Sequence, residues 1–240
     1  MKFAPQFEQR NLPDQLADHI VILIATGGML PAQRLVEKEL CESLGVSRIP
    51  LREALRILQA QGVIRTVPNR GSFVTEFGST ETAEMLQVRL SVERMAFRRV
   101  MKRVAQNPSI LRELRAKVEG LRQAARTLDQ LTYCQADLAF HQCVVELSES
   151  PLLKPIWNSL ARGVLFFLMQ ERQVRFDYRE SISEHNLLVE LISRGDPAAM
   201  EEEIERHILT KVSDSTLRAE KTSTKNASGK RGARMQRKPA

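Results

Sequence analysis

The sequence predicts a mainly α-helical protein in which a small β-hairpin interrupts the helices near the N-terminus. Apolar residues recur at three- and four-residue spacing along most of the chain, and only 11 glycines and 10 prolines occur in 240 residues, which favours long helices. Short β-branched segments occur at 63–67 and 72–76, on either side of the turn sequence PNRG at 68–71. This arrangement is typical of a hairpin.

Composition and charge exclude several classes of protein. The chain is 42% hydrophobic, and it has neither a run of 18 apolar residues nor an apolar signal segment, so we expect a cytoplasmic protein without membrane spans. The net charge of +7 belongs to residues 218–240, which hold eight basic residues and one acid; the other 217 residues hold 28 of each. We expect this basic tail to be disordered, so nucleic-acid binding must be argued from where charges lie.

Basic residues gather on one short helix before the hairpin. Helices are predicted over 12–26, 37–44 and 48–61, with Gly45 between the last two and Ser47 as the N-cap of the third. Arginines spaced by four residues line one face of this third helix, which fits a DNA major groove, while the hairpin tip can reach an adjacent groove. The candidate DNA contacts of this winged helix-turn-helix are Lys38, Arg48, Arg52, Arg56, Arg70 and Gly71.

A basic helix face alone would more simply be a solvated surface. Here the Gly45 turn, the pair of short helices and the basic hairpin tip occur together, and that combination favours DNA binding.

The rest of the chain is predicted to be helical as far as residue 217. Breaks at prolines and glycines divide it into six helices, at 80–104, 109–129, 132–148, 151–172, 178–194 and 197–217. We therefore expect a DNA-binding domain over 1–78, an all-α domain over 79–217 and a tail over 218–240.

Three of the four histidines lie in separate helices of this all-α domain. Asp137 precedes His141 by one helical turn, so the two side chains share a face. Together with His185 and His207 they make a donor set that suits Zn²⁺, or another divalent first-row metal such as Ni²⁺ or Mn²⁺. Any one of these histidines alone is better explained as an ordinary core or surface residue, because the sequence does not show which helices are neighbours.

The N-terminal segment carries three motifs, LVEKEL at 35–40, LGVSRIPLREAL at 44–55 and PNRGSFV at 68–74. In these motifs it resembles the GntR family of bacterial regulators. The resemblance implies DNA contacts from Lys38, Arg48, Arg52, Arg70 and Gly71. Two positions depart from the usual pattern, since Ala32 stands where a glycine is common and Val36 where a serine or threonine often caps the helix.

The all-α segment carries the motifs RLSVE at 89–93, DLAFH at 137–141, EHN at 184–186 and GD at 195–196, with His207. In these it resembles the ligand-binding (FCD) domain of the FadR-type branch of that family, and its six helices resemble the VanR-like subgroup. The resemblance implies an all-α antiparallel helical bundle that holds a metal with Asp137, His141, His185 and His207.

The side chain of Arg89 has two alternative roles. It can form a structural ion pair with Glu93, or it can bind the carboxylate of a small organic acid in a cavity. We expect a homodimeric transcription regulator, in the repressor direction, whose affinity for a pseudo-palindromic operator responds to this effector. The alternatives are a metal-dependent hydrolytic enzyme and a DNA-binding protein with a purely structural metal.

Overall fold

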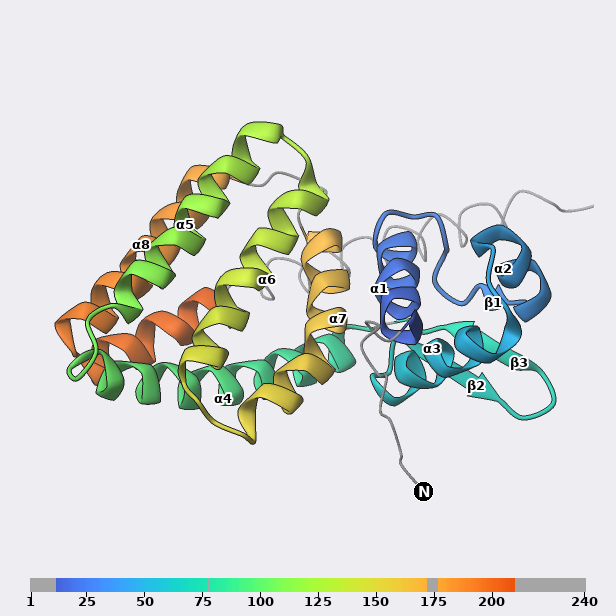
Figure 1. Cartoon of the computed structure of the whole chain (residues 1–240), viewed down its shortest axis with the longest axis horizontal. Helices are drawn as coiled ribbons and strands as arrows, with labels where there is room; N and C mark the ends of the chain where they lie inside the picture. The colour runs from blue at the N-terminus through green and yellow to red at the C-terminus, as the bar shows by residue number, and fades with distance from the viewer. Residues whose placement is uncertain (1–11, 77, 172–176, 210–240) are drawn as a thin grey trace, which may run out of the picture. The chain divides into compact units, whose positions relative to one another are not determined.

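The structure is a computed structural model that describes residues 12–76, 78–171 and 177–209. Helices dominate it, with a small sheet near the N-terminus, which confirms the predicted fold class (Figure 1). No helix in these three ranges is long and apolar enough to cross a membrane. The predicted tail over 218–240, and the predicted end of the last helix, lie outside the described residues.

The N-terminal segment has the predicted order of helices and hairpin. Its elements are α1 (Leu12–Ala25), β1 (Arg34–Leu35), α2 (Glu37–Leu44), α3 (Arg48–Ala60), β2 (Ile64–Val67) and β3 (Gly71–Val74). Gly45 ends α2 in the left-handed conformation, with φ +65°, and donates its N–H to the carbonyl of Cys41. Ser47 is the N-cap residue of α3 as predicted, but its hydroxyl makes no capping hydrogen bond.

The sheet contains a third strand that the sequence does not reveal. The antiparallel order is β1-β3-β2, and Arg34 and Leu35 pair with Phe73 and Ser72. A two-residue strand is too short to show an alternating pattern, and its partner lies far along the chain. Only the folded backbone brings the two together.

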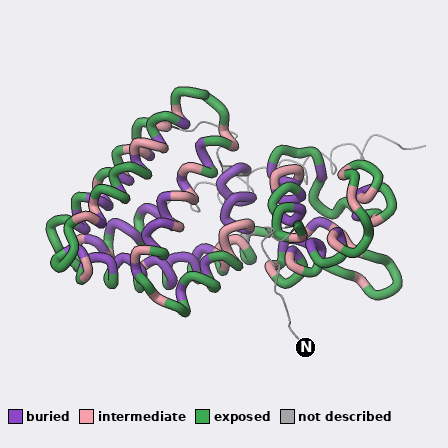
Figure 2. Tube along the Cα trace, in the orientation of Figure 1, coloured by how far each residue is buried: buried purple, intermediate pink, exposed green. Residues whose placement is uncertain are grey.

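The second half of the chain consists of helices close to the predicted bounds. They are α4 (Ser79–Val104), α5 (Ile110–Thr127), α6 (Gln130–Leu147), α7 (Leu153–Glu171), α8 (Tyr178–Arg194) and a helix over 197–209. Along α5 the residues Ile110, Leu114, Val118 and Leu121 are buried and those between them are more exposed, as the changes of colour in Figure 2 illustrate. Alternation of this kind means that α5 stabilises the fold through one apolar face.

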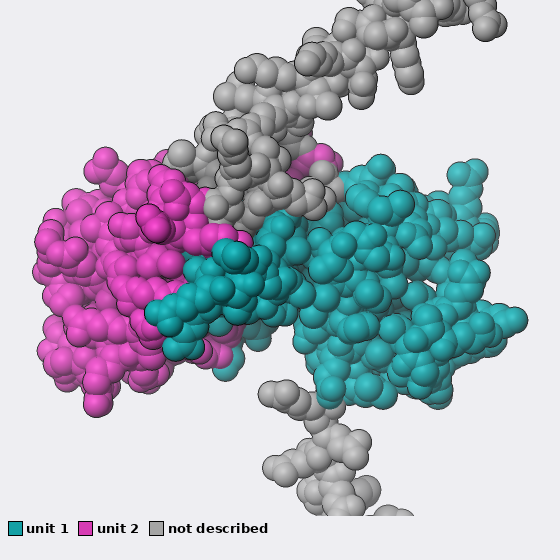
Figure 3. All heavy atoms as spheres, turned by 90° about the horizontal axis from the view of Figure 1, so that it is seen from above, with its two compact units in different colours: residues 1–76, 123–139, 151–176 teal, residues 77–122, 140–150, 177–240 magenta. Residues whose placement is uncertain are grey.

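By its contacts the chain divides into two compact units, coloured separately in Figure 3. The first unit comprises 1–76, 123–139 and 151–176, and the second comprises 77–122, 140–150 and 177–240. The division at 76/77 lies next to the predicted boundary at 78, while all of α7 and parts of α5 and α6 group with the N-terminal segment. The domain limits drawn from the sequence therefore stay a prediction.

Candidate metal centre and nucleic-acid interface

The basic side chains predicted to meet DNA are all exposed. Arg48, Arg52 and Arg56 lie on α3, Lys38 lies on α2, and Arg70 lies between β2 and β3. Leu51, Ala54, Leu55 and Leu58 are buried on the other side of α3. The apolar stripe thus fixes which face of α3 is presented to solvent.

Acidic neighbours hold some of these cations. Arg52 Nε donates to both carboxylate oxygens of Glu37, at 2.9 and 3.2 Å, and Arg56 pairs with Glu53 at 2.7 Å. Arg48 and Arg70 form no ion pair with any residue in the described part of the chain. A phosphate can therefore bind Arg48 or Arg70 without displacing a carboxylate, whereas Arg52 and Arg56 must exchange partners.

The hairpin tip requires an unusual backbone. Asn69 has φ +60° and Gly71 has φ +96°, as the glycine at this position predicted. A Cβ atom on Gly71 would lie 3.5 Å from Nε of Arg34. Arg34 is thus an exposed cation beside the tip that sequence reasoning missed, because its place depends on the unpredicted strand β1.

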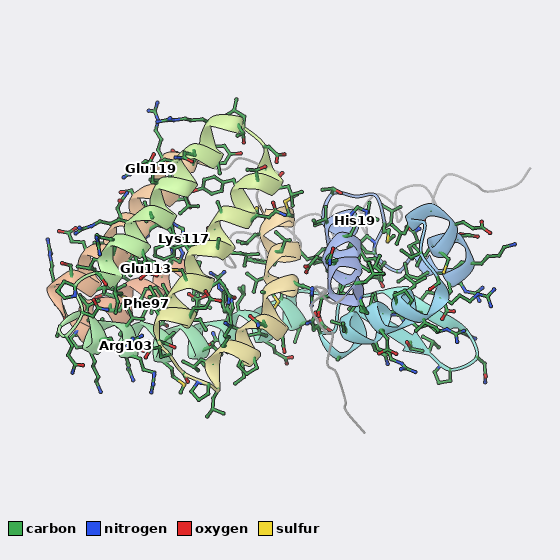
Figure 4. The ribbon with its side chains drawn as sticks, viewed as in Figure 1. His19, Phe97, Arg103, Glu113, Lys117 and Glu119 are labelled. Carbon is green, nitrogen blue, oxygen red and sulfur yellow. The ribbon has the colours of Figure 1, made fainter. Side chains whose placement is uncertain are left out.

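Three buried histidines converge in the second unit. His141 lies on α6, His185 on α8 and His207 on the helix over 197–209, and one ring nitrogen from each lies within 4.8 Å of the other two. His141 and His185 are completely buried and His207 is 2% exposed. His19, labelled in Figure 4, is exposed on α1 and belongs to the first unit. The structure therefore brings together three of the four predicted ligands.

Local structure positions each of these helices. Asp177 caps α8 by accepting from the N–H groups of Arg179 and Glu180 at 2.8 and 3.2 Å. The last carbonyls of α6 accept from arginines of α4, with Arg99 Nε 3.0 Å from Ser148 O and Arg103, labelled in Figure 4, on Leu147 O. These bonds satisfy carbonyls that a helix end leaves without partners.

The Nδ1 atom of each histidine lies against an oxygen. His185 Nδ1 donates to the carbonyl of Ser181 at 2.7 Å. His141 Nδ1 lies 2.5 Å from Glu93 Oε2, and His207 Nδ1 lies 3.1 Å from Glu184 Oε2. Because a carboxylate only accepts, we assign the proton to Nδ1 in all three rings.

This assignment places lone pairs on Nε2. The Nε2 atoms of His141 and His207 face each other at 3.2 Å. Two acceptor atoms repel at this distance unless a proton or a cation lies between them. At Zn–N bond lengths of about 2.0–2.1 Å, two tetrahedral ligands lie about 3.3 Å apart. The pair is therefore spaced for a shared metal ion.

The surroundings of the cluster are buried, and they are both aromatic and charged. The ring of Phe140 packs edge-on against His185 at a centroid distance of 4.8 Å. Burial alone would raise the pKa of Glu93, but the charge of Arg89 and the hydrogen bonds from His141 and Arg89 outweigh it and hold that pKa below its ordinary value. Glu93 is thus an ionised carboxylate at neutral pH.

Two further predicted site residues, Asp137 and Arg89, are buried. Asp137 is 1% exposed and lies one turn before His141 on α6, but the converging set consists of the three histidines alone. Arg89 is 3% exposed, and its Nε donates to Glu93 Oε1 at 2.6 Å. The ion pair that was one of the two alternatives for Arg89 is present; contact with an effector stays a prediction.

Both halves of the chain match described families. Residues 12–74 match "Bacterial regulatory proteins, gntR family", and residues 84–210 match the FCD domain. These ranges lie on either side of the predicted boundary near residue 78.

Characterised relatives are similar over most of their length. A probable D-xylose utilization operon transcriptional repressor of Paenarthrobacter nicotinovorans is 27% identical over 199 residues, covering 82% of this chain and 86% of that protein. The gluconate operon transcriptional repressor of Bacillus subtilis is 26% identical, covering 78% and 77%. The solved structure of E. coli McbR/YncC superposes with a TM-score of 0.74 at 23% identity, covering 87% of this chain and 98% of that one, a likeness of fold.

Proposed function

We propose, for a chain that belongs to the gntR family of bacterial regulatory proteins and carries an FCD domain, that a small organic acid bound at a divalent metal centre sets its affinity for operator DNA. Membership of this family makes the chain a DNA-binding transcription regulator rather than an enzyme. The hydrolase alternative is therefore set aside. The observation that carries the metal centre is the facing pair of Nε2 atoms in a cluster of three buried histidines.

The winged helix-turn-helix supplies the DNA contacts. We propose that α3 enters the major groove and that the tip between β2 and β3 contacts the backbone or the neighbouring groove. The proposed contact residues are Lys38, Arg48, Arg52, Arg56, Arg70 and Gly71. A homodimer in the cytoplasm would present two such helices to a pseudo-palindromic operator.

The proposed metal ligands are the Nε2 atoms of His141, His185 and His207, with Asp137 as the fourth. Imidazole nitrogens with one carboxylate suit Zn²⁺, and Ni²⁺ or Mn²⁺ are the alternatives. When bound, the metal would act as a Lewis acid toward an anionic oxygen, which would join these four ligands by expanding the coordination number. Arg89 has several N–H donors besides the Nε that Glu93 accepts from, and we propose that they help to hold the acid.

The charge of the effector follows from this chemistry. A metal and an arginine together select a carboxylate. One relative is named for the gluconate operon, and gluconate is itself a carboxylate. Both relatives are named as transcriptional repressors. We propose the same direction for this chain, with release of DNA when the acid binds.

The test couples ligand binding to DNA binding in the full-length protein. A thermal-shift screen of organic acids, including gluconate, is run with Zn²⁺ and with a chelator, and each stabilising acid is added to the protein on a duplex selected from a random-sequence library. We expect at least one acid to stabilise only the metal-loaded protein and to change its DNA affinity. If Zn²⁺ stabilises the protein but no acid alters DNA binding, the metal is structural and the effector proposal is wrong.

A further inference from the structure

We propose that two arginine–glutamate pairs position the metal-ligating histidines: Arg89 and Glu93 act on His141, and Arg206 and Glu184 act on His207. This inference rests on the metal centre proposed above and adds four residues that touch neither the metal nor an effector in this role. They form two parallel relays, each running from a guanidinium through a carboxylate to an imidazole.

The first relay is short and completely enclosed. Arg89 Nε lies 2.6 Å from Oε1 of Glu93, and the other carboxylate oxygen lies 2.5 Å from Nδ1 of His141. The side chains of Arg89 and Glu93 are 4% and 0% exposed. Both oxygens of Glu93 are therefore engaged, and its carboxylate is held in one orientation by groups on either side.

The second relay repeats this order at the edge of the cluster. Arg206 Nη1 lies 3.3 Å from Oε1 of Glu184, and Oε2 of Glu184 lies 3.1 Å from Nδ1 of His207. Here the glutamate is 12% exposed and the arginine 46%. The distances are longer and water has access, so this relay constrains its histidine less than the first.

The chemical effect of a relay is on the histidine. An acceptor at Nδ1 fixes the tautomer whose lone pair is on Nε2, and a carboxylate acceptor makes that nitrogen a stronger donor to a cation. The arginine keeps the carboxylate ionised and supplies the charge that balances it inside the protein. For His185 the carbonyl of Ser181 fixes the tautomer without adding charge.

Glu203 provides a matched control for the second relay. Its carboxylate binds the same arginine, with Arg206 Nη2 2.6 Å from Oε1 and Arg206 Nε 3.0 Å from Oε2. It is 8% exposed and makes no hydrogen bond to a histidine in the described residues. Glu203→Gln therefore removes an acid from the same cluster but leaves the Nδ1 acceptor of His207 in place.

The experiment measures Zn²⁺ affinity of the full-length protein by competition with a chelator of known affinity. We expect Glu184→Gln to weaken Zn²⁺ binding by about tenfold and Glu184→Ala by more, within the range of about 10- to 100-fold that such outer partners contribute. Glu203→Gln is expected to bind Zn²⁺ like the parent protein. The melting temperature of the metal-free protein should change no more for Glu184→Gln than for Glu203→Gln, which separates positioning from a general loss of stability.

The first relay is tested by the paired substitution Arg89→Met with Glu93→Gln. Removing both charges avoids leaving a buried arginine uncompensated, while the new amide oxygen can still accept from His141 Nδ1. We expect Zn²⁺ affinity to fall by about tenfold or more. As a second readout, imidazole ¹⁵N spectra of the metal-free parent protein should show His141 and His207 protonated at Nδ1.

The possible failures are distinct. Absence of Zn²⁺ binding by the parent protein would overturn the metal centre itself. Zn²⁺ binding of parental strength by both Glu184→Ala and the paired Arg89/Glu93 variant would overturn the relays and leave the metal centre standing.

Discussion

The Nε2 atoms of His141 and His207 lie 3.2 Å apart, although the two residues are 66 positions apart in the chain. We assign the proton of each ring to Nδ1, and the N–H groups of His141 and His207 donate hydrogen bonds to Glu93 and Glu184 respectively. The protein thus aims two lone pairs at one point in its interior. The two lone pairs repel each other when nothing lies between them, and a cation at that point would turn the repulsion into two favourable metal–nitrogen bonds.

Zn²⁺ should stabilise the second unit through these rings. A ligand that binds only the folded state at 100 times its Kd adds about 2.7 kcal/mol to the free energy of unfolding. We expect a raised melting temperature with Zn²⁺, and expect His207→Gln to abolish the increase. His19→Gln is the control, since His19 is exposed on α1; loss of the Zn²⁺ effect in that variant instead would contradict the cluster.

Arg48 should contribute more to DNA affinity than Arg56. Arg48 has no ion-pair partner to give up within the described residues, whereas Arg56 must leave Glu53. We expect Arg48→Ala to weaken binding and to reduce the slope of log affinity against log salt by about 1 if it meets a phosphate. Arg115→Ala on the exposed side of α5 should leave both quantities unchanged. Equal losses for Arg48→Ala and Arg115→Ala, measured by fluorescence anisotropy, would argue against the α3 interface.

Gly71→Ala should disturb the wing because of its backbone. At φ +96° an alanine is strained, at a cost of about 1–3 kcal/mol. We expect weaker DNA binding and a lower free energy of unfolding in urea. Gly120→Ala is the matched control, because Gly120 lies inside α5 and a Cβ there meets nothing within 4 Å; it should instead stabilise the protein by about 0.5–1 kcal/mol. A neutral Gly71→Ala would show that the tip tolerates another conformation.

Cys143 should resist alkylation near neutral pH. Burial raises the pKa of its thiol; Glu113 and Glu146 raise it further, while Lys117 lowers it. Glu113 and Lys117 are labelled on α5 in Figure 4. The thiolate is the reactive form of cysteine. A raised pKa lowers the fraction of thiolate at neutral pH, so the rate of alkylation should increase as the pH rises. Peptide mapping after brief treatment with iodoacetamide should find Cys41, which is half-buried, modified before Cys143; the reverse order would contradict the burial.

The sequence by itself determined the helices, the hairpin and the basic face of α3. These features are local: the spacing of Leu51, Ala54 and Leu58 decides which side of α3 is buried, and so leaves Arg48 exposed. The left-handed conformations of Gly45 and Gly71 are also local features, because glycine adopts positive φ without strain.

Only the tertiary structure decided which helices are neighbours. The strand β1 exists because Leu35 reaches Ser72, and the cluster exists because α6, α8 and the helix over 197–209 bring His141, His185 and His207 together. Nothing in the spacing of these residues along the chain encodes that meeting. The tertiary structure also decided that Glu93 contacts His141, because a hydrogen bond between α4 and α6 depends on packing that no local pattern expresses.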